Sequence, residues 1–348
     1  MPDKKILDAG DPANLELASE KIRTGGVVAF PTETVYGLGA DVFNKEAVCR
    51  VYEIKKRPSF DPLIVHVSSS DEALRLWREI PSVALTLMKK FWPGPLTLVL
   101  PKKHAVPDIV TAGLDTVAVR MPKHPAALEL IRKSGTPVAA PSANRFGHAS
   151  PTTAEAVYEE LGEGPDLILD GGSTPVGVES TVLKVEKKSG FLLRPGGIAL
   201  EELENFLRVR TVSDGGDVSR SPGRMESHYA IATPLHLAAQ PLGRCLEALE
   251  GFCESRPAVG RPKLGLLSFG DPESPAGLFQ AVEALSAKKD LREAAAKLFQ
   301  AMRKLDKMGL DLILAMPVPE KGLGLAIMDR LRKASGVDSL MEFLNGWK

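Results

Sequence analysis

Polar side chains suited to an anionic ligand are concentrated where predicted strands begin or end. Two threonines, a glutamate and a tyrosine follow the apolar run 27–30, within segment 31–39. Lys55-Lys-Arg57 closes a predicted helix just before strand 63–67, which contains His66. Fixed cations in a cleft neutralise the charge of a triphosphate leaving group. These segments favour a phosphate-binding cleft, while the alternative is that they only cap turns and helices.

Arg120 is the most informative single cation because it lies in an otherwise apolar predicted strand, 117–121. Burying a guanidinium is costly unless it is paired. Its planar fork of N–H donors matches a carboxylate. We therefore predict that Arg120 binds a ligand carboxylate, and the alternative is a structural ion pair.

Three further segments carry hydroxyl groups, small side chains or a cation beside predicted strands. They are 139–150, 177–181 and 193–197. Small side chains let the backbone approach a ligand, and hydroxyl groups bind phosphate or ribose. The sequence contains no P-loop, no G-x-S-x-G elbow and no H-E-x-x-H pair. Its histidines and cysteines lack metal-ligand spacing, so we expect no metal held by protein ligands alone.

The elements that must position these residues alternate between strands and helices, which predicts an α/β fold. Several strands follow one another directly, so we expect a twisted mixed sheet in the first domain. Thr152 and Glu155 form a predicted capping box for a helix over 153–161. The other predicted helices are 12–24, 82–92, 124–134 and one that begins at Asn44 and ends before Pro58, and the remaining strands are 96–100, 138–140, 167–169 and 181–185.

We predict a catalytic domain over 12–200, a linker over 201–235 and a smaller domain over 236–348. Residues 211–225 are polar and rich in glycine and serine, as interdomain linkers are. Beyond them, helix 242–253, strand 264–269, helix 289–307, strand 312–316 and helix 323–334 alternate. This rhythm predicts a Rossmann-like parallel α/β domain.

The composition excludes several classes of protein. The chain has 348 residues, and its 44 basic and 44 acidic side chains cancel. Extended disorder and a strongly basic nucleic-acid protein are therefore excluded. Three scattered cysteines suit a reducing cytoplasm. No apolar stretch approaches the length of a membrane span, so we expect no membrane partner.

The segments named above, taken in order, resemble the YrdC-type family over about residues 12–200. The matching segments are 31–39, 55–58, 62–66, 91–97, 119–122, 140–144, 179–182 and 194–198. The continuation, with Ser221-Pro-Gly223, His228-Tyr229-Ala230 and 322–332, is similar to the long two-domain members. This resemblance implies synthesis of L-threonylcarbamoyladenylate from L-threonine, bicarbonate and ATP with Mg²⁺, for the threonylcarbamoyladenosine modification of tRNA.

The resemblance also implies roles for individual residues. It assigns L-threonine binding to Thr34, His66, Arg120, Ser180 and the main chain at Ala140. It assigns ATP binding to Arg57, Asp61, Thr116, Ser142, Ser150, Arg194 and Tyr229. Because the chemistry needs no protein nucleophile, catalysis is expected to rest on positioning and on charge neutralisation by Lys55, Arg57 and Arg194.

Two departures from the family pattern bear on the ATP site. Asp61 stands where asparagine is common, and its carboxylate would repel a triphosphate unless Mg²⁺ lies between them. Residues 224–227 replace the usual methionine and aromatic of the linker. The Tyr229 lid is nevertheless expected to close over the nucleotide.

Two other functions remain open. One is a module that binds double-stranded RNA or tRNA, to which Lys89, Lys90, Lys102 and Lys103 could contribute, although the zero net charge argues against it. The other is related carbamoyl chemistry on a different substrate, as in hydrogenase-maturation carbamoyltransferases. Those proteins carry acylphosphatase-like and zinc-finger regions that this sequence lacks.

Overall fold

The computed structural model describes residues 5–211, 228–238, 242–257, 260–271, 277–335 and 340–346. It divides into two compact units, one of residues 1–146 and 150–224 and one of residues 147–149 and 225–348. The predicted linker residues 212–227, including Ser221-Pro-Gly223 and Arg224–Ser227, lie outside the described residues. Within the described ranges, no helix is both long and apolar enough to cross a bilayer.

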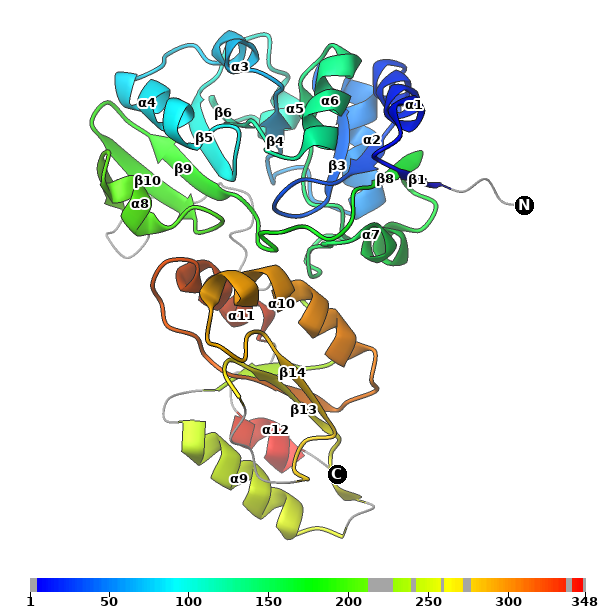
Figure 1. Cartoon of the computed structure of the whole chain (residues 1–348), viewed down its shortest axis with the longest axis vertical. Coiled ribbons are helices and arrows are strands. Elements are labelled where there is room, and N and C mark those ends of the chain that lie inside the picture. The colour runs from blue at the N-terminus through cyan, green and yellow to red at the C-terminus, as the bar shows by residue number, and fades with distance from the viewer. Residues whose placement is uncertain are drawn as a thin grey trace. The chain divides into compact units, whose positions relative to one another are not determined.

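The first unit is built around one 11-stranded sheet in the order β1-β8-β2-β3-β7-β4-β6-β5-β9-β10-β11 (Figure 1). Its strands are β1 Ile6–Asp8, β2 Val28–Phe30, β3 Gly37–Asp41, β4 Ile64–His66, β5 Leu96–Pro101, β6 Thr116–Arg120, β7 Val138–Ala139, β8 Leu167–Asp170, β9 Thr181–Val185, β10 Ser189–Arg194 and β11 Arg208–Arg210. Its helices are α1 Pro12–Arg23, α2 Lys45–Lys55, α3 Ser70–Leu76, α4 Ser82–Phe91, α5 Asp108–Thr111, α6 Pro125–Ser134, α7 Ala154–Leu161 and α8 Leu200–Glu204.

The sheet mixes parallel and antiparallel pairs, as the direct succession of strands predicts. β4 runs parallel to β6, while β7 and β5 flank this pair in the antiparallel sense. β5 then pairs in parallel with β9, and β9 pairs antiparallel with β10. The prediction of a twisted mixed sheet is confirmed. The central strands β4, β6 and β5 carry or adjoin the predicted site residues.

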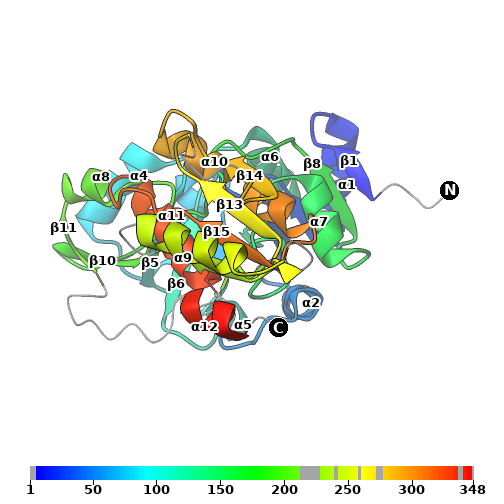
Figure 2. The same cartoon turned by 90° about the horizontal axis from the view of Figure 1, so that it is seen from below.

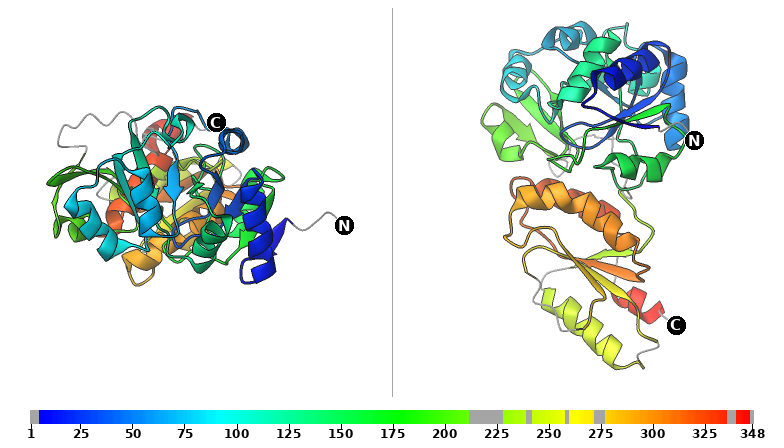
Figure 3. Two further views of the ribbon diagram at one scale, coloured as in Figure 1. Left: turned by 90° about the horizontal axis from the view of Figure 1, so that it is seen from above. Right: turned by 45° about the vertical axis from the view of Figure 1, so that its right-hand side comes forward.

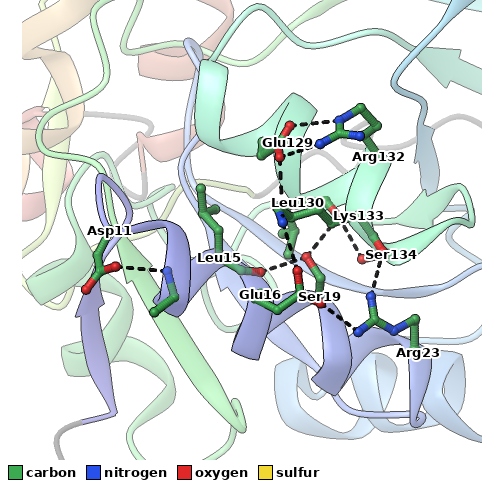
Figure 4. Close-up of polar contacts among 11 residues, drawn as sticks. Asp11, Leu15, Glu16, Ser19, Arg23, Glu129, Leu130, Arg132, Lys133 and Ser134 are labelled. Atoms are coloured by element: carbon green, nitrogen blue, oxygen red, sulfur yellow. Dashed lines mark hydrogen bonds and ion pairs between the residues drawn. The ribbon is translucent and has the colours of Figure 1, made fainter.

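Helices α1 and α6 pack together on one face of the sheet (Figure 4). Leu15 and Ile22 of α1 meet Leu130 and Ile131 of α6 over β2 and β8, and each fully buried aliphatic side chain contributes about 1.5–3 kcal/mol. Ser19 Oγ donates to Leu15 O at 2.7 Å and lies 3.3 Å from Leu130 O. Viewed from below, α2 lies on the other side of this part of the sheet (Figure 2).

Helix α2 determines where the Lys55–Arg57 cations stand. The Asn44 side chain accepts a hydrogen bond from Ala47 N and begins the helix, as predicted. Lys56 ends it in the left-handed conformation, with φ of 51°. Lys55 is thereby the last residue on the buried face of the helix, and Lys56 is exposed.

Two local expectations need correction. The N-cap of α7 is Thr153, whose side chain accepts from Ala156 N, rather than Thr152. Residues 201–211, assigned to the linker from composition, contain most of α8 and all of β11, which pairs with β10. Their short alternating run, Arg-Val-Arg, is sufficient for an edge strand but too short to be recognised by periodicity.

The second unit contains a four-stranded parallel sheet in the order β12-β15-β13-β14. Figure 3 shows α10 and α11 on one face of this sheet and α9 and α12 on the other. The prediction of a small parallel α/β domain is confirmed, although β12, β14 and α12 were not predicted. The elements are β12 Leu235–Leu237, α9 Leu242–Glu254, β13 Leu264–Ser268, β14 Ala281–Ala284, α10 Leu291–Asp306, β15 Leu312–Ala315, α11 Gly324–Ala334 and α12 Leu340–Gly346.

Candidate functional site

Arg120 lies at the end of β6 and is 4% exposed. Its Nη2 stands 2.7 Å from Glu33 Oε1, its Nη1 donates to Thr34 Oγ1 at 2.8 Å, and its Nε donates to Gly94 O at 3.3 Å. Glu33 Oε2 also accepts from Lys123 N at 2.9 Å. The ion pair that we considered as the alternative therefore exists. Even so, Nη2 makes no aligned hydrogen bond to any described residue, so N–H donors remain for a ligand.

Thr34 belongs to the turn between β2 and β3, and the turn is stabilised by its own hydroxyl groups. Thr32 Oγ1 lies 2.8 Å from Thr34 Oγ1 and donates to Val35 O at 2.6 Å. Thr32 Oγ1 also accepts from Thr34 N at 3.1 Å. The segment 174–177 covers this turn, because Gly177 N donates to Thr34 O. Thr32 and Thr34 are 2% and 0% exposed, so their hydroxyl groups meet little water.

Ser180 stands directly before β9 and joins the same neighbourhood. Its Oγ is 2.8 Å from Thr97 Oγ1 on β5, and the β5–β6 register places Thr97 beside Arg120. Arg194 Nη2 donates to Ser180 O at 3.0 Å and to Ser180 Oγ at 3.3 Å. A Cβ on Gly196 would lie 2.3 Å from Glu179 O, so glycine alone allows the chain after β10 to approach so closely.

His66 pairs with Arg120 across β4 and β6 and is 4% exposed. Burial first, and then the charge of Arg120, lowers the pKa of His66 to about 3. The imidazole is therefore neutral at physiological pH. Its Nδ1 makes no hydrogen bond to the described residues. Ala140 N donates to Ile64 O within the sheet, so a ligand at Ala140 would meet the carbonyl.

We predict that His66 makes the folded protein less stable as the pH falls. The pKa of His66 is about 3 in the folded protein and 6.5 in the unfolded chain. Between these two pH values, only the unfolded chain binds a proton at His66. Between pH 6.5 and 5 this should cost about 2 kcal/mol of unfolding free energy. Urea unfolding at several pH values measures it.

The control is the exposed His104. His66→Gln should remove this part of the pH dependence, whereas His104→Gln should leave it unchanged. Equal pH profiles for the wild type and His66→Gln would show that His66 does not resist protonation.

Lys55 lies at the other end of the candidate site and is 1% exposed. Its Nζ donates to the main-chain carbonyls of Ser142 and Asn144, at 2.5 Å in each case. Burial, and next the charge of Arg57, lowers the pKa of Lys55 well below its usual range. A bound polyanion would favour the charged form again.

Arg57 and Asp61 form a buried ion pair of 2.9 Å in the loop that follows α2. Arg57 also donates to Pro62 O at 3.0 Å. Burial raises the pKa of Asp61, while the charges of Arg57, Lys55 and Arg194 act to lower it. Arg57 thus supplies a charge opposite to that of the Asp61 carboxylate, and the expectation that Mg²⁺ lies between Asp61 and a bound triphosphate stays a prediction. Three predicted cations thus act on one carboxylate.

The remaining predicted ATP residues lie in three different segments of the first unit. Ser142 forms an isolated β-bridge with Gly37. Thr116 pairs with Pro101. Thr116 and Arg120 are at opposite ends of β6, about 13 Å apart at 3.3 Å per residue. The β4–β6 register, extended by two residues, places Thr116 opposite Pro62, whose carbonyl accepts a hydrogen bond from Arg57. Ser150 instead lies beside β9, where its hydroxyl donates to Glu179 Oε1 at 2.6 Å.

Tyr229, the predicted nucleotide contact of the lid, is buried within the second unit. Its ring centroid lies 4.2 Å from that of His228 and 5.5 Å from that of Phe299, and the Arg330 guanidinium lies 5.4 Å from it. Its φ of 65° is left-handed, which is rare for a non-glycine residue. Its contact with ATP stays a prediction.

Sequence reasoning assigned no role to four residues that contact the predicted site. Glu33 and Glu179 are buried carboxylates that bind Arg120 and Ser150. Thr97 contacts Ser180, and the Asn144 carbonyl accepts from Lys55. One signal in the sequence could have identified Glu33. A buried arginine needs a partner, and Glu33 lies in segment 31–39, which had already been singled out. The described residues contain no group of three or more His, Cys, Asp or Glu side chains placed to hold a metal.

Comparison with known proteins shows which family the chain belongs to. Residues 20–196 match the Sua5_yciO_yrdC family, described as "Telomere recombination", and residues 198–336 match the "Threonylcarbamoyl-AMP synthase, C-terminal domain". A threonylcarbamoyl-AMP synthase of Pyrococcus abyssi is 45% identical over 327 residues, covering 92% of this chain and 94% of the relative. One of Bacillus subtilis is 44% identical over 337 residues, covering 95% of each.

Solved structures show the same similarity. A P. abyssi Sua5 with two alanine substitutions has a TM-score of 0.84 and 43% identity, covering 95% of this chain and 96% of that one. P. abyssi Sua5 complexed with L-threonine has a TM-score of 0.82 and 44% identity, covering 92% and 94%. This chain belongs to the Sua5–YciO–YrdC family, in the form that also carries the threonylcarbamoyl-AMP synthase C-terminal domain.

Proposed function

We propose that this protein is a threonylcarbamoyl-AMP synthase, which joins L-threonine, bicarbonate and ATP. The amine of threonine captures the carbon of bicarbonate as a carbamate, with loss of water. A carbamate oxygen then attacks the α-phosphorus of ATP, the bond to the β-phosphate oxygen breaks, and pyrophosphate leaves. The products are threonylcarbamoyl-AMP, pyrophosphate and water.

The observation that carries this proposal is the similarity over nearly the whole length of both chains. Two relatives with this name share 44–45% of their residues with this chain, and each alignment spans at least 92% of both partners. The chain lies within this family over both of its parts. The alternative of carbamoyl chemistry on another substrate has no comparable support.

The threonine half of the site is proposed at the ends of β4 and β6. Arg120 would bind the carboxylate through the N–H groups that Glu33 and Gly94 leave available. Thr34, neutral His66 and Ser180 surround the same position and offer hydrogen bonds to the amine and hydroxyl groups. The Ala140 carbonyl adds an acceptor. These contacts select a small, polar amino acid rather than an apolar one.

The ATP half is proposed around Asp61, where Lys55, Arg57 and Arg194 act together. These cations would neutralise the phosphate charge that increases as pyrophosphate leaves. Ser142, Ser150, Thr116, Asp61 and Tyr229 remain the proposed further contacts of the nucleotide. Mg²⁺ would enter with ATP as part of the substrate and would help to neutralise the phosphate charge.

We further propose that the product serves tRNA modification in the cytoplasm. The partners would be tRNA or the enzymes that transfer the threonylcarbamoyl group. None of Cys49, Cys245 and Cys253 forms a disulfide, which suits a reducing compartment.

Pyrophosphate release tests the reaction. The full-length protein with MgATP should release pyrophosphate only when both L-threonine and bicarbonate are present. Mass spectrometry should detect threonylcarbamoyl-AMP under the same conditions. Omission of either co-substrate is the internal control.

The RNA-binding alternative gives the opposite pattern. Salt-dependent RNA affinity without pyrophosphate release would favour it and contradict the proposed synthase. Among the lysines considered for RNA contact, Lys102 is bound to Asp108 at 2.5 Å, which reduces the free positive charge of that surface.

A further inference from the structure

The two threonine hydroxyl groups in the turn between β2 and β3 each have one proton, and their contacts determine where each proton points. Thr32 has one hydroxyl proton. Its Oγ1 lies 2.6 Å from Val35 O, a carbonyl that can only accept. Two oxygens that close, without a proton between them, would repel. The Thr32 proton is therefore on the bond to Val35 O.

The proton of Thr34 follows from this assignment. Thr32 Oγ1 also lies 2.8 Å from Thr34 Oγ1, and its own proton is already used. Thr34 must then be the donor in that bond. With the bond from Thr34 N, Thr32 Oγ1 accepts two hydrogen bonds and donates one, so its capacity is filled.

A hydrogen bond from Arg120 occupies one of the two lone pairs of Thr34 Oγ1. Arg120 Nη1 donates to Thr34 Oγ1 at 2.8 Å. The only proton of Thr34 points to Thr32, and one lone pair receives the guanidinium N–H. One lone pair remains. Thr34 therefore offers the ligand an acceptor and cannot act as a donor without breaking its bond to Thr32.

We propose that Thr32 is a positioning residue that makes Thr34 a pure acceptor facing L-threonine. This inference rests on the proposed function, because it assumes that L-threonine binds beside Arg120. A carboxylate on Arg120 leaves the amine and hydroxyl groups of the same amino acid within reach of Thr34, and both are donors. An acceptor-only Thr34 matches those groups and rejects a second carboxylate oxygen.

Thr32→Val tests the proposal, since valine has nearly the same shape but no hydroxyl. Thr34 would then be free to turn its proton toward the ligand. Calorimetry should show L-threonine binding about tenfold weaker, the loss of roughly one oriented hydrogen bond, with ATP binding unchanged. Thr32→Ser keeps the hydroxyl and should bind as the wild type does. Thr86→Val, at an exposed helix position, is the matched control.

A double-mutant cycle separates positioning from a general structural role. If Thr32 acts through Thr34, then Thr32→Val should cause no further loss in a Thr34→Val background. Additive losses, or equal weakening of ATP and threonine binding, would overturn the proposal. If the Thr32→Val protein does not fold, Thr32→Ser still tests the proposal, because it should bind L-threonine as the wild type does. Failure of the wild type to bind L-threonine overturns the proposed function and this inference together, whereas tight binding by Thr32→Val overturns this inference alone.

Discussion

Arg120→Ala should weaken L-threonine binding by about 30-fold or more while ATP binding changes little. The loss of one buried charged partner of a ligand costs about 2–5 kcal/mol. Arg120 contacts Glu33, Thr34 and Gly94 on the proposed threonine side, whereas Asp61 and Lys55 mark the phosphate side. Calorimetric titration with each ligand separately measures the two effects.

The same substitution should destabilise the fold, which has to be separated from the loss of binding. Glu33 is 6% exposed and would become an unpaired buried carboxylate, at a cost of about 3–5 kcal/mol. The double variant Arg120→Ala/Glu33→Gln removes that charge. It should recover part of the stability without recovering threonine binding. The exposed pair Arg132–Glu129 provides the control substitution Arg132→Ala.

These variants decide between the two interpretations of Arg120. If the guanidinium only balances Glu33, the double variant should bind L-threonine almost normally once it is folded. If the guanidinium also meets the ligand carboxylate, binding stays weak in both variants. Recovery of threonine affinity in the double variant would reject the carboxylate role.

Much of the fold follows from local sequence. Strand 181–185 is a mostly apolar run, and α6 is an amphipathic repeat that begins at Pro125 and is followed by Gly135, so pattern alone predicts them. The direct succession of strands predicts a mixed sheet. Elements such as β11 and β14 are short and partly exposed, so no periodicity distinguishes them from loops.

The candidate site was less predictable, because its pairings depend on strand register. Arg120 in an apolar strand indicates that it needs a partner, but the sequence does not say whether that partner is a ligand or Glu33. The structure shows that both uses are compatible, because Glu33 leaves donors of Arg120 available. Asp61 is similar. Its spacing of four residues from Arg57 was visible, yet only the loop geometry brings their charges to 2.9 Å.

Lys55 illustrates the opposite case, in which the sequence identified the residue and the structure changes the expected mechanism. A lysine at the end of a helix is usually an exposed partner of the helix dipole. Here the side chain is buried, and two of its three N–H groups bind the carbonyls of Ser142 and Asn144. When the amine is protonated, its third N–H and its charge are available for the proposed phosphate oxygen.

Lys55→Met should therefore lower the rate of pyrophosphate release by about 10²- to 10³-fold, the effect of removing one fixed donor from a developing negative charge. L-threonine binding should be nearly unchanged. Met also leaves two buried carbonyls without their donor, so thermal unfolding must be measured alongside. Lys55→Gln is the second variant, because its amide can donate to both carbonyls but carries no charge.

The adjacent Lys56 gives a matched control, since it is exposed and differs from Lys55 in orientation rather than in chemistry. Lys56→Met should retain normal turnover. If Lys55→Gln folds and releases pyrophosphate within threefold of the wild-type rate, the ammonium serves only to bind the loop of residues 142–144. A large loss in Lys55→Gln, with the loop still ordered and threonine still bound, would instead assign the charge itself to the reaction. The buried ammonium then stabilises the leaving pyrophosphate from a position fixed before ATP arrives.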